Sequence, residues 1–208
     1  MKKVLLFASI LMVLVVFFAA CNHNTPPDET EPTEPTESIG LEFVSNGDGT
    51  CVVKGRGTCK DVNVRIPAIS PTGDRVTSIG KDAFYYEFRL FSIEIPGSVA
   101  SIGEDAFANC QDLITVVISD GVTTIGSSAF KDCSSLSTIV IPDSVTSIGS
   151  SAFKDCSSLS TIVIPDSVTS IGSEAFSGCS SLSAIDISDS VTSIDRATFS
   201  GCSSLSTI

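Results

Sequence analysis

The segment 127–149 reads SSAFKDCSSLSTIVIPDSVTSIG, and the segment 150–172 repeats it letter for letter. From Ser78 onward the same pattern forms five full units of 23 residues and a truncated sixth, without insertions. An active site is normally one asymmetric group of unlike side chains, whereas a verbatim copy adds only more of the same surface. Self-similarity at a period of about 20 to 50 residues is typical of solenoid proteins. The repeat therefore predicts a solenoid and weighs against catalysis.

Apolar residues recur at fixed positions in every unit. Three such columns are Ile79, Ile102, Ile125, Ile148, Ile171 and Ile194; Phe84, Phe107, Phe130, Phe153, Phe176 and Phe199; and Leu90, Leu113, Leu136, Leu159, Leu182 and Leu205. One unit offers about eight inward side chains, each contributing roughly 1.5–3 kcal/mol when fully buried. Ordering its residues costs about 1.5 kcal/mol each, more than about 30 kcal/mol in total. A single unit cannot fold alone, but stacked units can.

Each unit predicts the same local structure. The segment around Ile139 and Ile141 alternates apolar and other residues, which favours a strand that ends at Pro142. The V-T-S-I segment predicts a second strand on another side of the coil, and the glycines Gly126, Gly149 and Gly172 predict tight turns with positive φ. The S-S-A-F-K-D-C segment predicts one short helical turn that begins at serine.

The L-x-x-I-x-I-P core that follows an A-F-x-x-C turn resembles the BspA-type leucine-rich repeat of bacterial surface proteins. The segment 46–59, NGDGTCVVKGRGTC, is similar to the hairpin that often precedes such repeats. The resemblance covers about residues 41–208. It implies a β-rich leucine-rich-repeat-like solenoid on the bacterial cell surface that binds extracellular partners, and it does not fix the ligand.

The two ends of the repeat array differ. Residues 39–77 are predicted to form an N-terminal capping β-hairpin, which turns near 54–57, and a degenerate repeat that contains Val64, Ile66 and Val76. This region would cover the first coil and its strand edge, as solenoids require. The chain stops within a unit at Ile208. We expect either a fragment of a longer protein, the favoured interpretation, or an edge that meets a partner.

Residues 1–20 read as an export signal, because two lysines precede an apolar run and small residues. The sequence Phe18-Ala19-Ala20-Cys21 resembles a lipobox, and Phe18 stands where Leu is usual. An uncleaved anchor or a plain secretory signal is the alternative. Residues 21–38 are rich in Pro, Thr and Glu and predict an extended tether. We therefore expect an exported protein, lipid-anchored to a bacterial membrane through Cys21 and displayed on the cell surface.

Charge and histidine content exclude several functions. The net charge is −12, so there is no basic stripe for a nucleic-acid backbone and no attraction to anionic membrane surfaces. Membrane contact is expected through the lipid anchor only. The one histidine, His23, lies in the tether, so the repeats lack histidine-based catalytic and metal sites. We predict no enzyme activity, no cofactor and no metal site.

Two groups of cysteines are treated separately. A column at 23-residue spacing is predicted to pack inside the coils as small apolar residues: Cys110, Cys133, Cys156, Cys179 and Cys202. Cys51 and Cys59 are local, and in an exported hairpin they are candidates for a disulfide. A column of acids is predicted to be solvated turn residues, rather than a calcium site or a hydrolase pair: Asp120, Asp143, Asp166 and Asp189.

The outward residues of the main strands predict one broad binding face. Its candidate residues are Glu94, Thr115, Val117, Thr138, Val140, Thr161, Val163 and Asp186, with Ser92, Ala184 and Thr207 beside them. Repeated small side chains suit weak, multivalent contact with an extracellular protein or glycan, in an adhesin-like role. The alternative is that they are only good strand formers in a display or spacer element, or in a non-catalytic part of a longer surface protein.

The first unit breaks the pattern with aromatic and basic residues in its turn. These are Tyr85, Tyr86, Phe88, Arg89 and Phe91. Such residue types are enriched in binding hot spots. Capping contacts with the N-terminal hairpin explain them equally well, and capping is the favoured interpretation.

Overall fold

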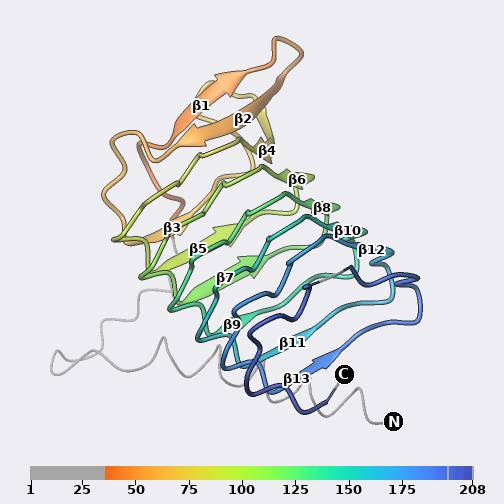
Figure 1. Ribbon diagram of the computed structural model, residues 1–208. Helices are drawn as coiled ribbons and strands as arrows, with labels where there is room; N and C mark the ends of the chain where they lie inside the picture. Colours follow the sequence, from red (N-terminus) through yellow and green to blue (C-terminus); the bar gives the residue numbers. More distant parts are fainter. Residues whose placement is uncertain (1–35, 196, 208) are drawn as a thin grey trace, which may run out of the picture. The chain divides into compact units, whose positions relative to one another are not determined.

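The computed structural model describes residues 36–195 and 197–207. Successive repeats stack as coils of a solenoid, with short strands on two sides of the stack (Figure 1). Each strand lies beside its equivalent in the next coil: Ile102 lies opposite Ile125, and Ile125 opposite Ile148. The predicted β-rich solenoid of 23-residue coils is confirmed.

The strands form three sheets. The first begins with the antiparallel pair β1 (Glu42–Ser45) and β2 (Thr50–Gly55) and continues in parallel through β4 (Arg75–Ile79), β6 (Ser101–Ile102), β8 (Thr124–Ile125), β10 (Ser147–Ile148) and β12 (Ser170–Ile171). The second contains β3 (Asn63–Arg65), β5 (Ser92–Ile95), β7 (Thr115–Ile118) and β9 (Thr138–Ile139). The third pairs β11 (Thr161–Val163) with β13 (Ala184–Asp186). Both predicted strands of the repeat are therefore present.

The core lies between the two strand rows and is continuous along the stack. The phenylalanine column forms a run of parallel rings, with centroids 5.1 Å apart at Phe84–Phe107 and 5.4 Å apart at Phe130–Phe153. These four rings are fully buried. Since each ring is covered by the rings before and after it, burial depends on the neighbouring coils, as expected for a unit that cannot fold alone.

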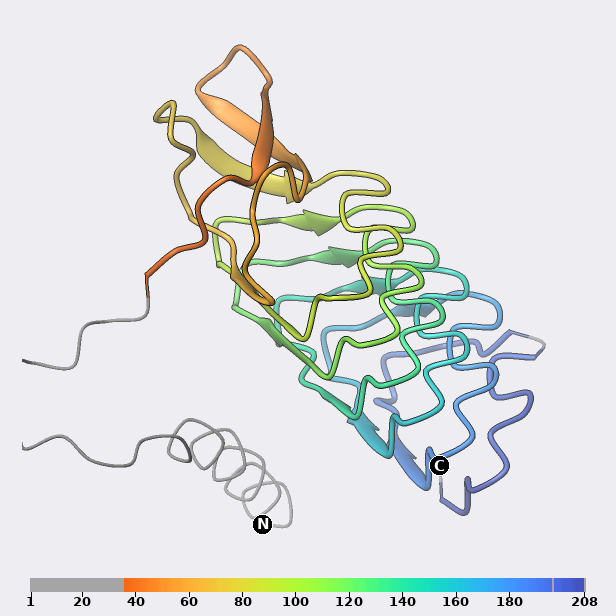
Figure 2. The ribbon, with the colours of Figure 1, turned by 90° about the vertical axis from the view of Figure 1, so that its left-hand side faces the viewer.

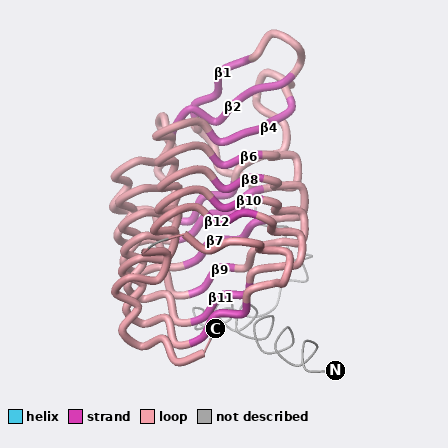
Figure 3. Tube along the Cα trace, turned by 45° about the vertical axis from the view of Figure 1, so that its right-hand side comes forward, coloured by secondary structure: helices cyan, strands magenta, loops and turns pink. Residues whose placement is uncertain are grey.

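The predicted helical turns are absent from the described residues, and Figure 3 shows loops and turns in their place. In the segment that contains Phe130, every second amide donates to the next coil: Ser128, Phe130 and Asp132 each donate at 2.8 Å. The amides between them donate within their own coil. A helix would keep all of these bonds inside the segment. Positive φ angles at Ser128 (54°) and Asp132 (59°) produce the alternation.

The glycine column serves a different purpose from the one predicted. Gly126, Gly149 and Gly172 do not have positive φ. A Cβ atom on Gly149 would lie 2.5 Å from the Ser127 nitrogen and 2.6 Å from the Gly126 carbonyl carbon. The column is glycine because the backbones of successive coils approach too closely for a side chain.

The N-terminal hairpin lies at one end of the stack (Figure 2). It is followed by a degenerate coil that contributes β3 and β4, and the interior residues Val64, Ile66 and Val76 of this coil are buried. The hairpin turns at 46–49, where the Asn46 amide donates to the Thr50 carbonyl, and not at 54–57 as predicted.

This turn position explains why the structure contradicts the predicted disulfide. Cys51 lies opposite Ser45 on β1, whereas Cys59 lies beyond the end of β2. Both cysteines are free and buried, and the Cys51 thiol lies 3.7 Å from the Asp74 carbonyl oxygen. The sequence prediction was wrong because it centred the turn between the two cysteines.

Candidate functional site

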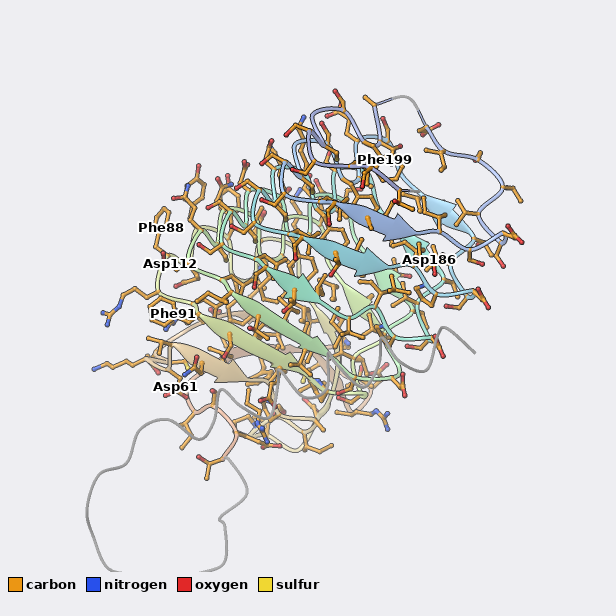
Figure 4. All side chains as sticks on the ribbon, turned by 90° about the horizontal axis from the view of Figure 1, so that it is seen from below. Asp61, Phe88, Phe91, Asp112, Asp186 and Phe199 are labelled. Carbon is orange, nitrogen blue, oxygen red and sulfur yellow. The ribbon has the colours of Figure 1, made fainter. Side chains whose placement is uncertain are left out.

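The residues predicted to form a binding face lie in a row of outward side chains on, or directly after, β5, β7, β9, β11 and β13. They alternate with buried residues: Val116 and Ile162 are 3% exposed, whereas Val140 is 42% exposed. Register brings the predicted residues together across coils, with Glu94 opposite Val117, Thr115 opposite Thr138, and Val163 opposite Asp186. Figure 4 shows the side chains along this face, with Asp186 labelled on β13. We call this surface the strand face.

The strand face changes in character along the stack. At its N-terminal end the Ser92 hydroxyl donates to Asn63 at 2.9 Å, and Arg65 forms a 2.7 Å ion pair with Glu94. Its centre contains the Thr and Val residues of the duplicated coils. Asp186 is exposed at the other end. A partner that lies along the face would therefore meet an ion-paired edge, a neutral centre and an acidic edge.

The hydrogen-bonded ladder under the strand face is interrupted between the two identical coils. Within the described residues, β9 is the last strand of the four-stranded sheet, and β11 begins a separate two-stranded sheet. The row of outward side chains continues across this interruption, from Thr138 and Val140 to Thr161 and Val163. The strand face is thus continuous as a surface but not as a sheet.

The cysteine column packs in the core as predicted. Each thiol donates to the carbonyl oxygen of a phenylalanine in the preceding coil, at 3.1 Å from Cys133 to Phe107 and from Cys156 to Phe130. Burial raises the pKa of the Cys110 and Cys179 thiols to about 12, and that of Cys133 and Cys156 well above the usual range. These thiols stay protonated at neutral pH, and a protonated thiol is neither a nucleophile nor a metal ligand.

The acidic column lies on the solvated rim. Asp120, Asp143, Asp166 and Asp189 are all exposed. Within residues 36–195 and 197–207, no group of three or more His, Cys, Asp or Glu side chains is placed to hold a metal ion.

The aromatic residues in the turn of the first coil are half exposed. Tyr85, Tyr86 and Phe88 are 46–47% exposed and Phe91 is 41% exposed. Tyr86 packs edge-on against both Tyr85 and Phe88, with ring centroids 4.6 and 5.5 Å apart. Figure 4 shows Phe88 and Phe91 on the same side of the molecule as Asp61 and Asp112. Capping contacts therefore leave about half of each ring open to solvent.

A pocket of about 490 Å³ opens beside the rings. Its lining comes from two segments and consists of Arg56, Cys59, Lys60, Tyr86, Glu87, Phe88 and Arg89. We call it the basic pocket. Arg56 connects its walls, because its guanidinium pairs with Glu87 at 3.0 Å and also donates to the carbonyl oxygens of Cys59, at 3.0 Å, and Asp61.

Sequence reasoning missed Arg56 and Lys60. Arg56 lies 31 residues before its partner Glu87, and no spacing rule connects them. One signal was available in the sequence. Glu87 interrupts the cysteine column in the coil next to the cap, and an acid in that position requires a partner.

Sequence reasoning also missed the role of the repeated Ser and Thr residues. Hydroxyl groups donate to carbonyl oxygens of the preceding coil, as Thr146 does to Thr123 at 3.2 Å and Ser167 does to Val145 at 2.6 Å. The same type of bond recurs along the stack at Thr123, Ser144, Ser157, Thr169, Ser180, Ser183, Ser203 and Ser206. These Ser and Thr side chains therefore connect successive coils.

The predicted signal, residues 1–20, and the lipidation residue Cys21 lie outside the described residues, as does most of the predicted tether. In the part of the chain that the structure describes, no helix is both long and apolar enough to cross a membrane.

Comparison with known structures finds relatives that share this architecture. A T. pallidum leucine-rich repeat protein is 31% identical with a TM-score of 0.78, and the match covers 84% of this chain and 81% of that chain. A Bacteroides ovatus leucine-rich repeat protein is 35% identical with a TM-score of 0.72, and the match covers 83% of this chain and 46% of that chain. The pneumococcal vaccine antigen PcpA, at 22% identity and a TM-score of 0.54, shares the fold, with 74% of this chain and 50% of that chain covered.

Comparison with curated protein sequences gives no match. The model of the BspA-type leucine-rich repeat region, in contrast, matches residues 77–206 in six copies. These six copies cover the coils described above and extend over more than half of the chain. The chain therefore belongs to the BspA-type leucine-rich repeat family.

Proposed function

We propose that this protein is a lipid-anchored cell-surface protein that binds an extracellular protein or glycan through the strand face, in an adhesin-like role. The observation that carries the proposal is the register of the outward side chains. Thr115 lies opposite Thr138, and Thr161 opposite Ala184, so equivalent side chains form rows across the coils. An extended partner would meet the same weak contact several times, and linked weak contacts give high overall affinity.

The arrangement of chemical groups favours binding over catalysis. Catalysis needs unlike groups that converge on one reacting atom. On the strand face equivalent groups lie side by side in a row and do not converge on one point, and the thiols of the core are held protonated by burial. A flat face of repeated residues suits recognition instead.

The second candidate function is display, in which the coils only extend the chain. One observation favours it. The centre of the strand face is composed of Thr and Val, and it contains no aromatic or arginine anchor of the kind that dominates binding energy at interfaces. The two candidate functions differ in one measurable property: a binding face gives saturable binding of a partner, whereas a display element gives none.

The test uses immobilised extracellular-matrix proteins and a glycan array, with binding of the repeat protein measured by surface plasmon resonance. The variant Val140→Lys/Val163→Lys adds two charges at the centre of the strand face. We expect it to weaken binding about tenfold or more, because two desolvated contacts are replaced by charges. The matched control is Thr146→Lys/Thr169→Lys, which adds the same charge at exposed residues beside β10 and β12.

Unchanged affinity of the strand-face variant would exclude this face as the site. Absence of saturable binding to every protein and glycan tested would favour display. The anchor is tested separately with Cys21→Ser, which we expect to release the protein from the membrane fraction and to abolish incorporation of an alkyne-labelled fatty acid. Retention of both properties would contradict lipidation at Cys21.

A further inference from the structure

Exposed large apolar side chains gather at one place on the molecule. Of the ten large apolar side chains that are exposed among the described residues, five lie in the first two repeats: Tyr85, Tyr86, Phe88, Phe91 and Ile114. Tyr86 and Phe88 also line the basic pocket. We call these five residues the apolar patch. Scattered exposed apolar residues are normal on a protein surface, whereas a contiguous group marks an interaction site.

Two members of the apolar patch, Phe91 and Ile114, are held side by side by the backbone, and Figure 4 shows Phe88 on the same side as Phe91. The Phe91 amide donates to the Val62 carbonyl at 2.7 Å, and the Ile114 amide donates to the Phe91 carbonyl at 2.9 Å. Phe91 and Ile114 are therefore neighbours in successive coils, at the start of β5 and β7. Ile114 is 49% exposed, and the equivalent residues of the next two coils are Ser137 and Ser160. The patch ends where the duplicated coils begin.

The basic pocket adds charge to this surface. Arg56 is neutralised by Glu87. Lys60 and Arg89 also line the pocket and are exposed, and neither has an ion-pair partner among the described residues. The protein as a whole carries a net charge of −12. Lys60 and Arg89 thus place positive charge beside the aromatic rings of an acidic chain, on a side that also carries Asp61 and Asp112, and both cations are complementary to an acid.

The pocket is built before a partner arrives. The Arg56 guanidinium holds the loop through the Cys59 carbonyl oxygen, and Cys59 itself is buried. The rings of Tyr86 and Phe88, which also line the pocket, pack edge-on against each other. A preformed pocket loses little conformational freedom on binding, which favours affinity.

We propose that the basic pocket and the apolar patch together bind a protein segment in which an acidic side chain lies next to an apolar one. The acidic side chain enters the pocket and pairs with Lys60 and Arg89. The apolar side chain covers Phe91 and Ile114. Aromatic residues and arginine are the residue types enriched at the cores of protein interfaces. A sugar could stack on the rings, but it would leave the aliphatic Ile114 side chain without a suitable partner. The chemistry therefore favours a peptide over a glycan.

This site is distinct from the centre of the strand face, and the proposal for one site does not depend on the proposal for the other. The patch lies at the start of β5 and β7, whereas Val140 and Val163 lie in the duplicated coils. A partner at one site does not require the other.

The experiment measures binding of the protein to an array of randomised peptides of about ten residues and to an array of acidic oligosaccharides. We expect the bound peptides to be enriched in Asp or Glu beside Leu, Phe or Tyr. The variant Lys60→Glu/Arg89→Glu should reduce this binding about tenfold or more, since attraction becomes repulsion at both cations. Phe91→Ser/Ile114→Ser should reduce binding of the same peptides and leave its salt dependence unchanged.

The matched control is Lys54→Glu/Arg75→Glu, which reverses the same number of charges at exposed residues of the N-terminal region. It should bind the peptides like the wild type, and Val140→Lys/Val163→Lys should do so too. Binding of acidic oligosaccharides without binding of peptides would overturn the proposal in favour of a glycan. An equal loss of peptide binding in the control and in Lys60→Glu/Arg89→Glu would also overturn the proposal. So would a set of bound peptides that is not enriched in Asp or Glu. Circular dichroism spectra and thermal midpoints verify that each variant is folded.

Discussion

The first coil and the duplicated coils have the same interior and different exteriors. Phe84 in the first coil and Phe130 in a duplicated coil are both fully buried, and each stacks on the ring of the next coil at 5.1 and 5.4 Å. Around the first ring the turn carries exposed Tyr and Phe side chains, whereas Lys, Asp and Ser occupy the equivalent positions of the duplicated coils. The buried residues determine the conformation of the coil, so the outward residues of the turn can differ between coils without changing the fold.

The same comparison explains the one exception in the cysteine column. Cys133 and Cys156 face a preceding repeat and donate to its phenylalanine carbonyl. The first coil instead faces the N-terminal cap, and Glu87 at the equivalent position pairs with Arg56 from that cap. The residue in this position therefore depends on what lies on its N-terminal side.

The largest effect should come from a matched pair of phenylalanine truncations. Phe130→Ala removes a fully buried ring from the column, and we expect a loss of about 3–5 kcal/mol in the free energy of unfolding. Phe88→Ala removes a half-exposed ring of the first coil and should change stability by about 0.5 kcal/mol or less. Urea denaturation measures both. Similar losses in the two variants would break the distinction between a common interior and a specialised exterior.

A smaller effect is expected at the glycine column. Gly149→Ala places a methyl group against the backbone of the preceding coil, and overpacking of this kind costs about 1–3 kcal/mol. Gly47→Ala is the control, because nothing lies within 4 Å of the added atom and only the positive φ of 81° opposes it. Thermal or urea unfolding measures both variants. A smaller loss at Gly149 than at Gly47 would contradict the close approach of the coils.

Stability should fall at alkaline pH because of the cysteine column. Below pH 9 the Cys110 thiol is protonated in both states, so it adds no pH dependence. Above pH 9 the unfolded thiol ionises, while the pKa of the folded thiol is raised to about 12, so the unfolded state is increasingly favoured until that pH. The loss approaches about 1.4 kcal/mol per pH unit for one cysteine.

Urea denaturation at pH 8, 10 and 11 tests this expectation. Cys110→Ala is the comparison, because it removes one ionising thiol and should flatten the alkaline decline. An equal decline in the variant would exclude the thiol as its cause. All other groups are present in both proteins and cancel in the difference.

The smallest effect should come from the hydroxyl bonds between coils. Thr146→Val keeps the shape of the side chain and removes the bond to the Thr123 carbonyl, which is solvent-accessible, so we expect a loss of about 0.5 kcal/mol. Denaturation midpoints of the single variant and of Thr146→Val/Thr169→Val measure it. No change in either variant would show that water replaces these bonds fully.

The sequence predicted the parts of the fold that repetition determines. The solenoid, the two strands of each coil and the buried cysteine column follow from residues that recur at one spacing, since the same position in successive coils has the same neighbours. The turn around Phe130 was predicted to be helical because a short polar segment resembles a helix start. The pattern alone does not show that every second amide has a partner in the next coil.

The candidate sites divide in the same way. The strand face was predictable residue by residue because strand alternation places Thr138 and Val140 outward. The basic pocket was not predictable, because the Arg56–Glu87 ion pair lies where the N-terminal cap contacts the first coil, and this contact is not repeated along the chain. The prediction of a Cys51–Cys59 disulfide was wrong for a related reason. A hairpin turn that is displaced by a few residues changes every cross-strand neighbour.

The bonds between coils have a consequence for how such a gene can change. Side-chain bonds from one coil to the preceding one span 22, 23 or 26 residues, and strand pairs such as Ile148–Ile171 span the same period. Loss of a single codon in a repeat would shift all of these partners together. Recombination between the identical segments 127–149 and 150–172 removes or adds a whole layer and preserves every pairing. Homologous chains should therefore differ in length by multiples of 23 residues.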